Sequence, residues 1–108
     1  MPVGEDREKM KLFVDDWRSA PEGWETARSV PEAIERLRVG KVEEVSLDYV
    51  IGDDFENNFS PVARFIADMP ESQRPKRVII HTSSSEGARL LRRILEGRVE
   101  RVLGSYDA

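Results

Sequence analysis

The chain has 108 residues, of which 39% are hydrophobic and 35% charged, a size and composition that fit one small globular core. No stretch is long and apolar enough to span a membrane, and the start of the chain is polar, so we expect a cytoplasmic protein without membrane contact. The absence of cysteine excludes disulfides, thiolate metal sites and cysteine nucleophiles. The formal net charge of −4 argues against generic DNA binding.

The chain begins with a segment that lacks apolar periodicity. We expect residues 1–10 to form a mobile tail ahead of a single α/β domain over residues 11–108. The apolar run 12–14 then stops at Asp15 and Asp16, a pattern typical of a buried strand that carries carboxylates at its carboxyl end.

A loop and a short strand are expected before the first helix. Segment 17–24 contains proline and glycine, which predicts a loop in place of a full crossover helix. Residues 25–28 are long enough only for a brief edge strand. Ser29 and Glu32 have the spacing of a capping box, and apolar residues at helical intervals then predict a helix that ends before Gly40.

The middle of the chain repeats this pattern. Segment 42–48 alternates like a strand and ends in another carboxylate, Asp48. Segment 49–58 is rich in glycine, aspartate and asparagine, which predicts a polar loop. Apolar residues spaced three and four apart predict the next helix over residues 60–69.

The last third contains the most strand-like run, 78–80, and polar residues 81–85 follow it directly. Residues 86–95 have the apolar spacing of a helix that presents its arginines to solvent. Segment 99–103 gives a weak strand signal. Each of the three main strands is therefore followed by polar side chains.

Alternating strands and helices predict an open, mostly parallel α/β sheet of four to five strands with helices on both faces. In such sheets the ligand site lies at the carboxyl ends of the strands, near the point where the strand order reverses. Neighbouring strands are roughly 4.8 Å apart, so polar residues that follow them can converge on one small site. The residues expected there are Asp15, Asp16, Asp48, His81, Thr82 and Ser83.

Carboxylates crowded together repel one another, and burying them is costly unless a cation or a proton compensates. Oxygen ligands without cysteine favour Mg²⁺ or Mn²⁺ over Zn²⁺. A cation held in this way accepts phosphate oxygens, and Thr82, Ser83 and the N–H groups of the following helix are donors for the same anion. The alternative is structural: the aspartates cap turns, His81 is a satisfied core group, and Trp17 and Trp24 pack the loop between them.

Three short motifs suggest a family. Residues 14–18 read Val-Asp-Asp-Trp-Arg, residues 47–52 read Leu-Asp-Tyr-Val-Ile-Gly, and residues 81–83 read His-Thr-Ser with Gly87 beyond them. This pattern resembles the receiver domains of bacterial response regulators and, more closely, the cyclic-phosphate processing receiver domains. The resemblance implies a receiver-like (flavodoxin-like) fold and a role in handling nucleotide cyclic phosphates.

The resemblance also implies roles for individual residues. It makes Asp15 and Asp16 metal ligands, Asp48 the central carboxylate and Arg18 a phosphate contact, while His81 and Ser83 face the substrate. Tyr49 and Val50 stand where the family has a histidine and a second aspartate. No lysine follows Lys76, whereas phospho-accepting receivers have one after the fifth strand, so phosphorylation of Asp48 is not expected.

Two classes of function fit these residues. In the first, a metal-dependent phosphoesterase acts on nucleotide or RNA-end cyclic phosphates, with Asp48 and His81 as catalytic residues and Arg18, Thr82 and Ser83 on the phosphate. In the second, a non-catalytic receiver-like module regulates a protein partner. Val50 favours the second class because it cannot replace a carboxylate.

Overall fold

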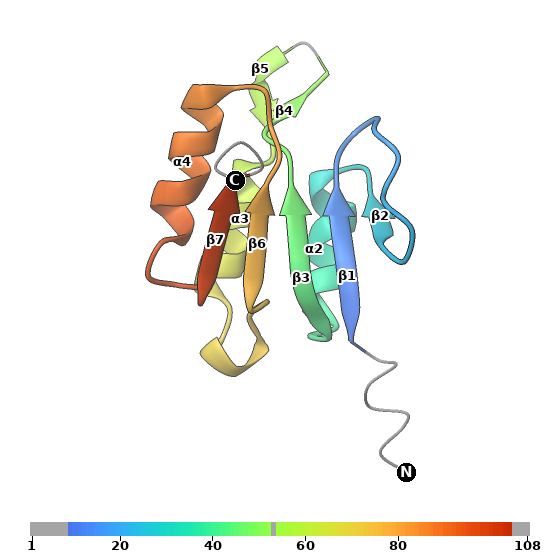
Figure 1. The fold of residues 1–108 in the computed structure, drawn as a ribbon, viewed down its shortest axis with the longest axis vertical. Coiled ribbons are helices and arrows are strands. Elements are labelled where there is room, and N and C mark those ends of the chain that lie inside the picture. Colours follow the sequence, from blue (N-terminus) through green and yellow to red (C-terminus); the bar gives the residue numbers. More distant parts are fainter. Residues whose placement is uncertain (1–8, 53, 105–108) are drawn as a thin grey trace.

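The structure, a computed structural model, describes residues 9–52 and 54–104 (Figure 1). The strands are β1 (Met10–Val14), β2 (Glu25–Ala27), β3 (Val42–Leu47), β4 (Val50–Ile51), β5 (Asp54–Asn58), β6 (Arg77–Ile80) and β7 (Arg101–Gly104). The helices are α2 (Val30–Arg38), α3 (Ser60–Asp68) and α4 (Ser85–Leu95), and a 3₁₀ turn spans Glu71–Gln73.

Five parallel strands form the main sheet in the order β2-β1-β3-β6-β7. The chain passes from β1 outward to β2 and then crosses back to β3, so the strand order reverses between β1 and β3. The carboxyl ends of β1, β3 and β6 lie side by side at one edge of the sheet (Figure 1). The predicted fold class, an open parallel α/β sheet, is confirmed.

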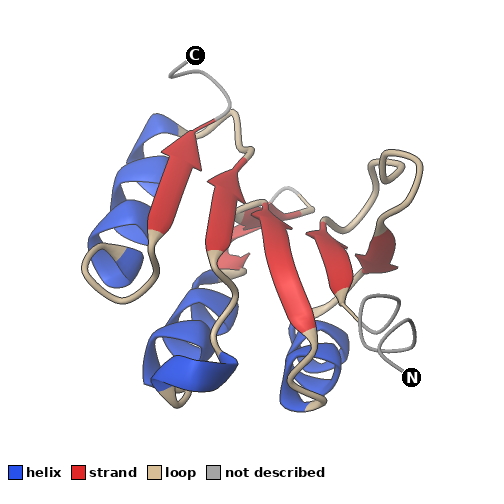
Figure 2. Ribbon diagram, turned by 60° about the horizontal axis from the view of Figure 1, so that its bottom comes forward, coloured by secondary structure: helices blue, strands red, loops and turns tan. Residues whose placement is uncertain are grey.

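The three helices cover one face of this sheet (Figure 2), whereas the sequence suggested helices on both faces. The reason is the handedness of the connections. Crossovers to β3, β6 and β7 all run in the same direction across the sheet, and right-handed crossovers in one direction place their helices on one face. The connection from β1 to β2 runs the other way, and within the described residues it contains no helix because Pro21 and Gly23 interrupt it.

The core lies between the sheet and these helices. Alternate residues of β1, β3 and β6 point into it, since side chains alternate between the faces of a strand. Leu12, Val14, Val45, Leu47, Val78 and Ile80 are all at most 2% exposed. Helices α2, α3 and α4 bury one apolar side each against these strands.

The segment expected as a polar loop, 49–58, instead forms an antiparallel hairpin of β4 and β5. Gly52 provides the turn, since its φ of +62° lies in the left-handed region that favours glycine. The tail expected over residues 1–10 lies mostly outside the described residues, and Met10 already belongs to β1. None of the described helices has the length and apolar character needed to cross a membrane.

Candidate metal and phosphate site

The register of the sheet explains why three distant residues meet. Phe13 of β1 pairs with Ser46 of β3, and Ser46 pairs with Ile79 of β6, so these residues form a row on the face without helices. Side chains repeat on one face every second residue. The next row on that face therefore consists of Asp15, Asp48 and His81.

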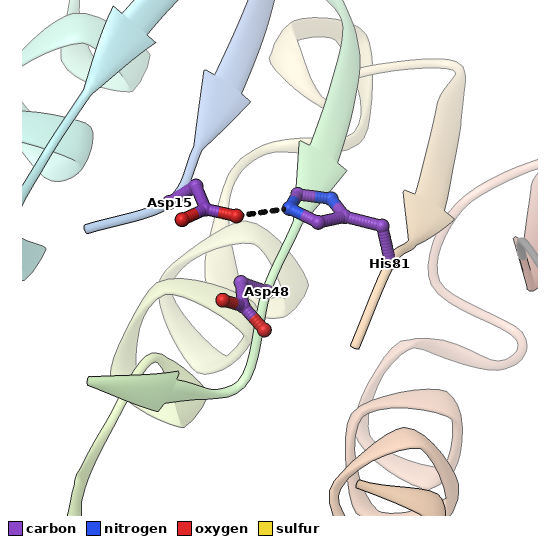
Figure 3. A group of neighbouring side chains, drawn as sticks. All are labelled: Asp15, Asp48 and His81. Carbon is purple, nitrogen blue, oxygen red and sulfur yellow. Dashed lines mark hydrogen bonds and ion pairs between the residues drawn. The ribbon is translucent and has the colours of Figure 1, made fainter. Parts of the chain in front are cut away.

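Backbone hydrogen bonds extend the parallel ladder to this row. Asp48 N donates to Val14 O at 3.0 Å, and His81 N donates to Leu47 O at 2.9 Å. One potential ligand atom each of Asp15, Asp48 and His81 lies within 4.8 Å of the other two (Figure 3). The structure thus brings together three of the residues that the sequence placed at this edge.

Asp15 is completely buried and is held as a carboxylate by its donors. Its Oδ1 accepts hydrogen bonds from the N–H groups of Trp17 and Arg18 at 3.0 and 2.9 Å, and its Oδ2 lies 2.8 Å from His81 Nε2. Burial alone raises the pKa of Asp15, but these hydrogen bonds and the charge of a protonated His81 outweigh burial and lower that pKa. Asp15 therefore remains ionised although it is buried.

Asp48 is in the opposite situation. Burial, followed by repulsion from the nearby carboxylate of Asp15, raises the pKa of Asp48. Three contacts offset part of this rise: the N–H of Tyr49 at 2.7 Å from Oδ1, the imidazole of His81 and the hydroxyl of Thr82. A carboxylate in this position gains stability from a cation, because a cation relieves both causes of the raised pKa.

Asp16 lies apart from this group. Its side chain points away from the row of Asp15, since consecutive residues face opposite sides as the chain leaves β1. Its Oδ2 accepts a hydrogen bond from Gly52 N at 2.8 Å and so holds the β4–β5 turn beside the site. The structure therefore connects Asp16 to the hairpin and not to the tight group of ligand atoms, although Asp16 does line the adjoining cleft.

That cleft, of about 680 Å³, opens at the carboxyl edge of the sheet. It is lined by Asp16, Trp17, Arg18, Asp48, Val50, Gly52, Thr82, Ser83, Ser84, Ser85, Glu86 and Arg89. Two arginines contribute positive charge, one from the loop after β1 and one from α4. Asp48 belongs both to the cleft and to the buried row, and it connects the two.

The start of α4 supplies donors to the cleft. Ser84 caps the helix: its Oγ accepts from Gly87 N at 3.0 Å, and its carbonyl accepts from Ala88 N. The N–H groups of Ser85 and Glu86, at the first two helical positions, have no acceptor within the helix. Unpaired N–H groups at a helix start favour anions.

The remaining predicted residues lie on or behind the cleft. Thr82 is buried, and its Oγ1 accepts a hydrogen bond from Ser84 N at 3.2 Å, so it also shapes the start of α4. Ser83 is exposed and lines the cleft, as does Arg18. His81 does not line the cleft, and it lies behind Asp48 with both ring nitrogens hydrogen-bonded.

The donor set determines which cations fit the row. Two carboxylates and one imidazole are ligands that proteins use for Zn²⁺, and the carboxylates also suit Mg²⁺ and Mn²⁺. Asp15 and Asp48 repel each other at this distance, so a divalent cation between them is favourable. The residues present therefore fit a divalent cation, and the imidazole adds Zn²⁺ to the expected Mg²⁺ and Mn²⁺.

Several site residues escaped the sequence analysis. Arg89 was expected to face solvent, but it lies at the cleft because α4 starts there. Ser46 and Arg28 carry no motif: Ser46 Oγ lies 2.7 Å from His81 Nδ1, and Arg28 donates to the carbonyls of Asp15 and Arg18. The packing role considered for Trp17 is wrong, because this side chain is 70% exposed at the cleft.

Comparison with known proteins identifies the family. The sequence profile of the Cyclic-phosphate processing Receiver domain matches residues 10–97, which include the whole site. The chain belongs to this family of receiver domains, as the sequence motifs suggested. A comparison with curated proteins finds no match.

Among solved structures, the chain is similar to the response regulator domain of Thermotoga maritima CheB. The TM-score is 0.52 at 18% sequence identity, and the similarity covers 89% of this chain and 77% of the CheB chain. The likeness supports the receiver fold.

The two positions that differ from the family motif have different surroundings. Val50 lines the cleft, where it presents an apolar side chain in place of the family's aspartate. Tyr49 packs against α4 at Gly87 and is absent from the cleft lining. The substitution at position 50 therefore changes the cleft directly, whereas the one at position 49 acts on packing.

Proposed function

We propose that this receiver-like domain binds a divalent cation at Asp15, Asp48 and His81 and uses the adjoining cleft to bind and hydrolyse a nucleotide or RNA-end cyclic phosphate. The observation that carries the proposal is the position of Asp48. It is the one residue that belongs both to the group of ligand atoms and to the lining of the cleft among the described residues. A cation at Asp48 is therefore next to the place where a phosphate fits.

The phosphate part of the proposal rests on the donors around the cleft. Arg18 and Arg89 approach it from different elements, and the unpaired N–H groups of Ser85 and Glu86 lie at its wall. Guanidinium and backbone N–H groups bind phosphate oxygens by charge-assisted hydrogen bonds. Ser83 adds an exposed hydroxyl at the same wall.

The nucleotide part rests on Trp17. A tryptophan that is 70% exposed beside two arginines is a flat surface on which a base can stack. The guanidinium of Arg18 lies 5.3 Å from the centroid of the Trp17 ring, so the loop after β1 presents a ring and a cation together. We assign the base to Trp17 and the phosphate to the arginines.

A bound divalent cation would supply charge neutralisation and an activated water for phosphoester hydrolysis. This chain's own residues would hold and orient the reactants. Asp15 and Asp48 provide the negative charge for the cation, and Thr82, hydrogen-bonded to Asp48, keeps that carboxylate in place. His81 lies behind Asp48, which makes it a ligand of the cation in this proposal and not a group that touches substrate.

A second candidate function is a non-catalytic receiver-like module that binds a cation or phosphate and regulates a partner. The observation that favours it is Val50, an apolar residue inside a cleft that otherwise carries charges and hydroxyls. A missing carboxylate removes one group that could position water. Turnover is the property that separates the two candidates.

The test is an assay with 2′,3′-cyclic nucleotides, with and without Mn²⁺ or Zn²⁺. The proposal expects turnover that needs the cation and that Asp48→Asn abolishes. Binding of the nucleotide without turnover would identify the regulatory module. If neither binding nor turnover occurs, the assignment of the cleft to nucleotides is wrong.

A further inference from the structure

The imidazole of His81 has a fixed orientation. Its Nδ1 lies 2.7 Å from Ser46 Oγ, and its Nε2 lies 2.8 Å from Asp15 Oδ2. Phe13 stacks on the ring with 4.6 Å between centroids and an interplanar angle of 7°. A ring turned over about its Cβ–Cγ bond would lose both hydrogen bonds, so each nitrogen keeps its own partner.

Ser46 reaches His81 because of the sheet register. Ser46 of β3 pairs with Ile79 of β6, and His81 follows two residues later on the same face. The residue is only 7% exposed, and a buried hydroxyl is costly unless it is hydrogen-bonded. The partner that meets this requirement is the imidazole.

The partners determine where a neutral ring carries its proton. A carboxylate only accepts hydrogen bonds, so the contact between Nε2 and Asp15 requires the proton on Nε2. Nδ1 is then an acceptor, and the Ser46 hydroxyl donates to it. This is the tautomer that the structure favours without a cation.

A cation changes this arrangement. When Nε2 ligates a metal it carries no proton, so the proton of the neutral ring moves to Nδ1. Nδ1 then needs an acceptor at the same place where it had a donor. A hydroxyl meets both needs by rotating about its Cβ–Oγ bond, whereas a carbonyl or a carboxylate can only accept.

We propose that Ser46 is a positioning residue that supports both neutral tautomers of His81 and thereby allows Nε2 to turn from Asp15 to a bound cation. Metal-bound histidines commonly have a hydrogen-bond acceptor on the other nitrogen, and loss of that partner typically lowers metal affinity about 10- to 100-fold. The inference rests on the proposed function, because it takes the cation site as given.

Nitrogen-15 NMR tests this directly, because His81 is the only histidine in the chain. Spectra of the neutral ring without a cation should show the proton on Nε2. Addition of Zn²⁺, which is diamagnetic, should move the proton to Nδ1. A ring that keeps the proton on Nε2 when Zn²⁺ is bound would overturn the proposal, as would a proton on Nδ1 before Zn²⁺ is added.

Two variants separate the hydroxyl from its surroundings. Ser46→Ala should bind Zn²⁺ about 10- to 100-fold more weakly, and Ser46→Thr, which keeps the hydroxyl, should restore the affinity. Wild-type affinity in Ser46→Ala would contradict the inference while leaving the cation site intact. If the unaltered chain binds no Zn²⁺, the cation site itself is wrong, and the cation-dependent part of the inference is wrong with it.

Discussion

The ring of Tyr49 lies against the Cα of Gly87 so closely that a Cβ at position 87 would be 2.4 Å from two ring atoms. This contact joins the residue after Asp48 to the first turn of α4, and so connects the cation ligand with the phosphate-facing helix start. The N–H of Tyr49 is also the donor to Asp48 Oδ1. Packing at one glycine therefore supports the geometry of the site.

Gly87→Ala tests this contact. Alanine in a helix is normally more stable than glycine by about 1 kcal/mol, but here the added methyl group must displace the Tyr49 ring. We expect a net loss of about 1–3 kcal/mol in the free energy of unfolding, measured by urea denaturation. Glu86→Ala, at an exposed neighbouring position, is the control, and a Gly87→Ala chain more stable than the unaltered one would show that the ring moves freely.

Asp15 and Asp48 should respond oppositely to removal of charge. Asp15→Asn removes the carboxylate that accepts from Trp17, Arg18 and His81, and we expect it to lower the free energy of unfolding by about 1–3 kcal/mol near neutral pH. Asp48→Asn removes a buried, repelled carboxylate, and without a cation it should stabilise the chain by about 1 kcal/mol. Equal losses in both variants would contradict the charge relationships described above.

The pH dependence follows from the same shifts. Asp15 has a lowered pKa in the folded chain, so its stabilising contribution is complete above the usual aspartate pKa and is lost as the pH falls through that value and the lowered one. Asp48 has a raised pKa, so its destabilising effect disappears as the pH falls through the raised value. Denaturation at a series of pH values should show the two variants approaching the unaltered chain in acid. A stability difference that stays constant with pH would contradict both shifts.

Arg89 should bind phosphate from α4. Arg89→Ala should weaken the affinity for a nucleotide phosphate about tenfold or more, since a hydrogen bond to a charged group contributes about 1.5–3 kcal/mol. Isothermal titration with a nucleoside monophosphate measures this. Arg93→Ala, on the same helix but outside the cleft lining, is the matched control. Equal affinities in both variants would place the phosphate elsewhere.

Trp17 should report on a bound base. In a Trp24→Phe background Trp17 is the only tryptophan, so its emission should change when a nucleotide binds but not when inorganic phosphate binds. Trp17→Ala should lose about 1–3 kcal/mol of nucleotide affinity, the usual contribution of stacking. An unchanged nucleotide affinity would exclude the stacking role while leaving the phosphate contacts in question.

The sheet and the location of the site follow from a simple sequence pattern. Apolar runs that end in Asp15, Asp48 and His81 predict parallel strands with polar residues at their carboxyl ends, and the register brings these ends together. The pattern works because strand burial and side-chain alternation depend on nearby residues. The hairpin over residues 50–58 lacks such a pattern, since its strands are short and its composition is polar.

Other features depend on three-dimensional contacts that no local pattern reveals. Ser46 interacts with a residue 35 positions away, and Arg89 lies at the cleft because of the direction in which α4 leaves the sheet. Asp16 looks equivalent to Asp15 in the sequence, yet it faces the other way and holds Gly52. Orientation at the end of a strand therefore decides the roles of two adjacent aspartates.

The most direct test of the central claim is a Mn²⁺ titration followed by electron paramagnetic resonance, which measures free Mn²⁺. The account predicts saturable binding of one ion per chain, weakened more than about tenfold in Asp48→Asn and unchanged in Asp68→Asn, an exposed carboxylate on α3. Absence of saturable binding, or equal binding by Asp48→Asn and the unaltered chain, would contradict a cation site at the meeting point of β1, β3 and β6.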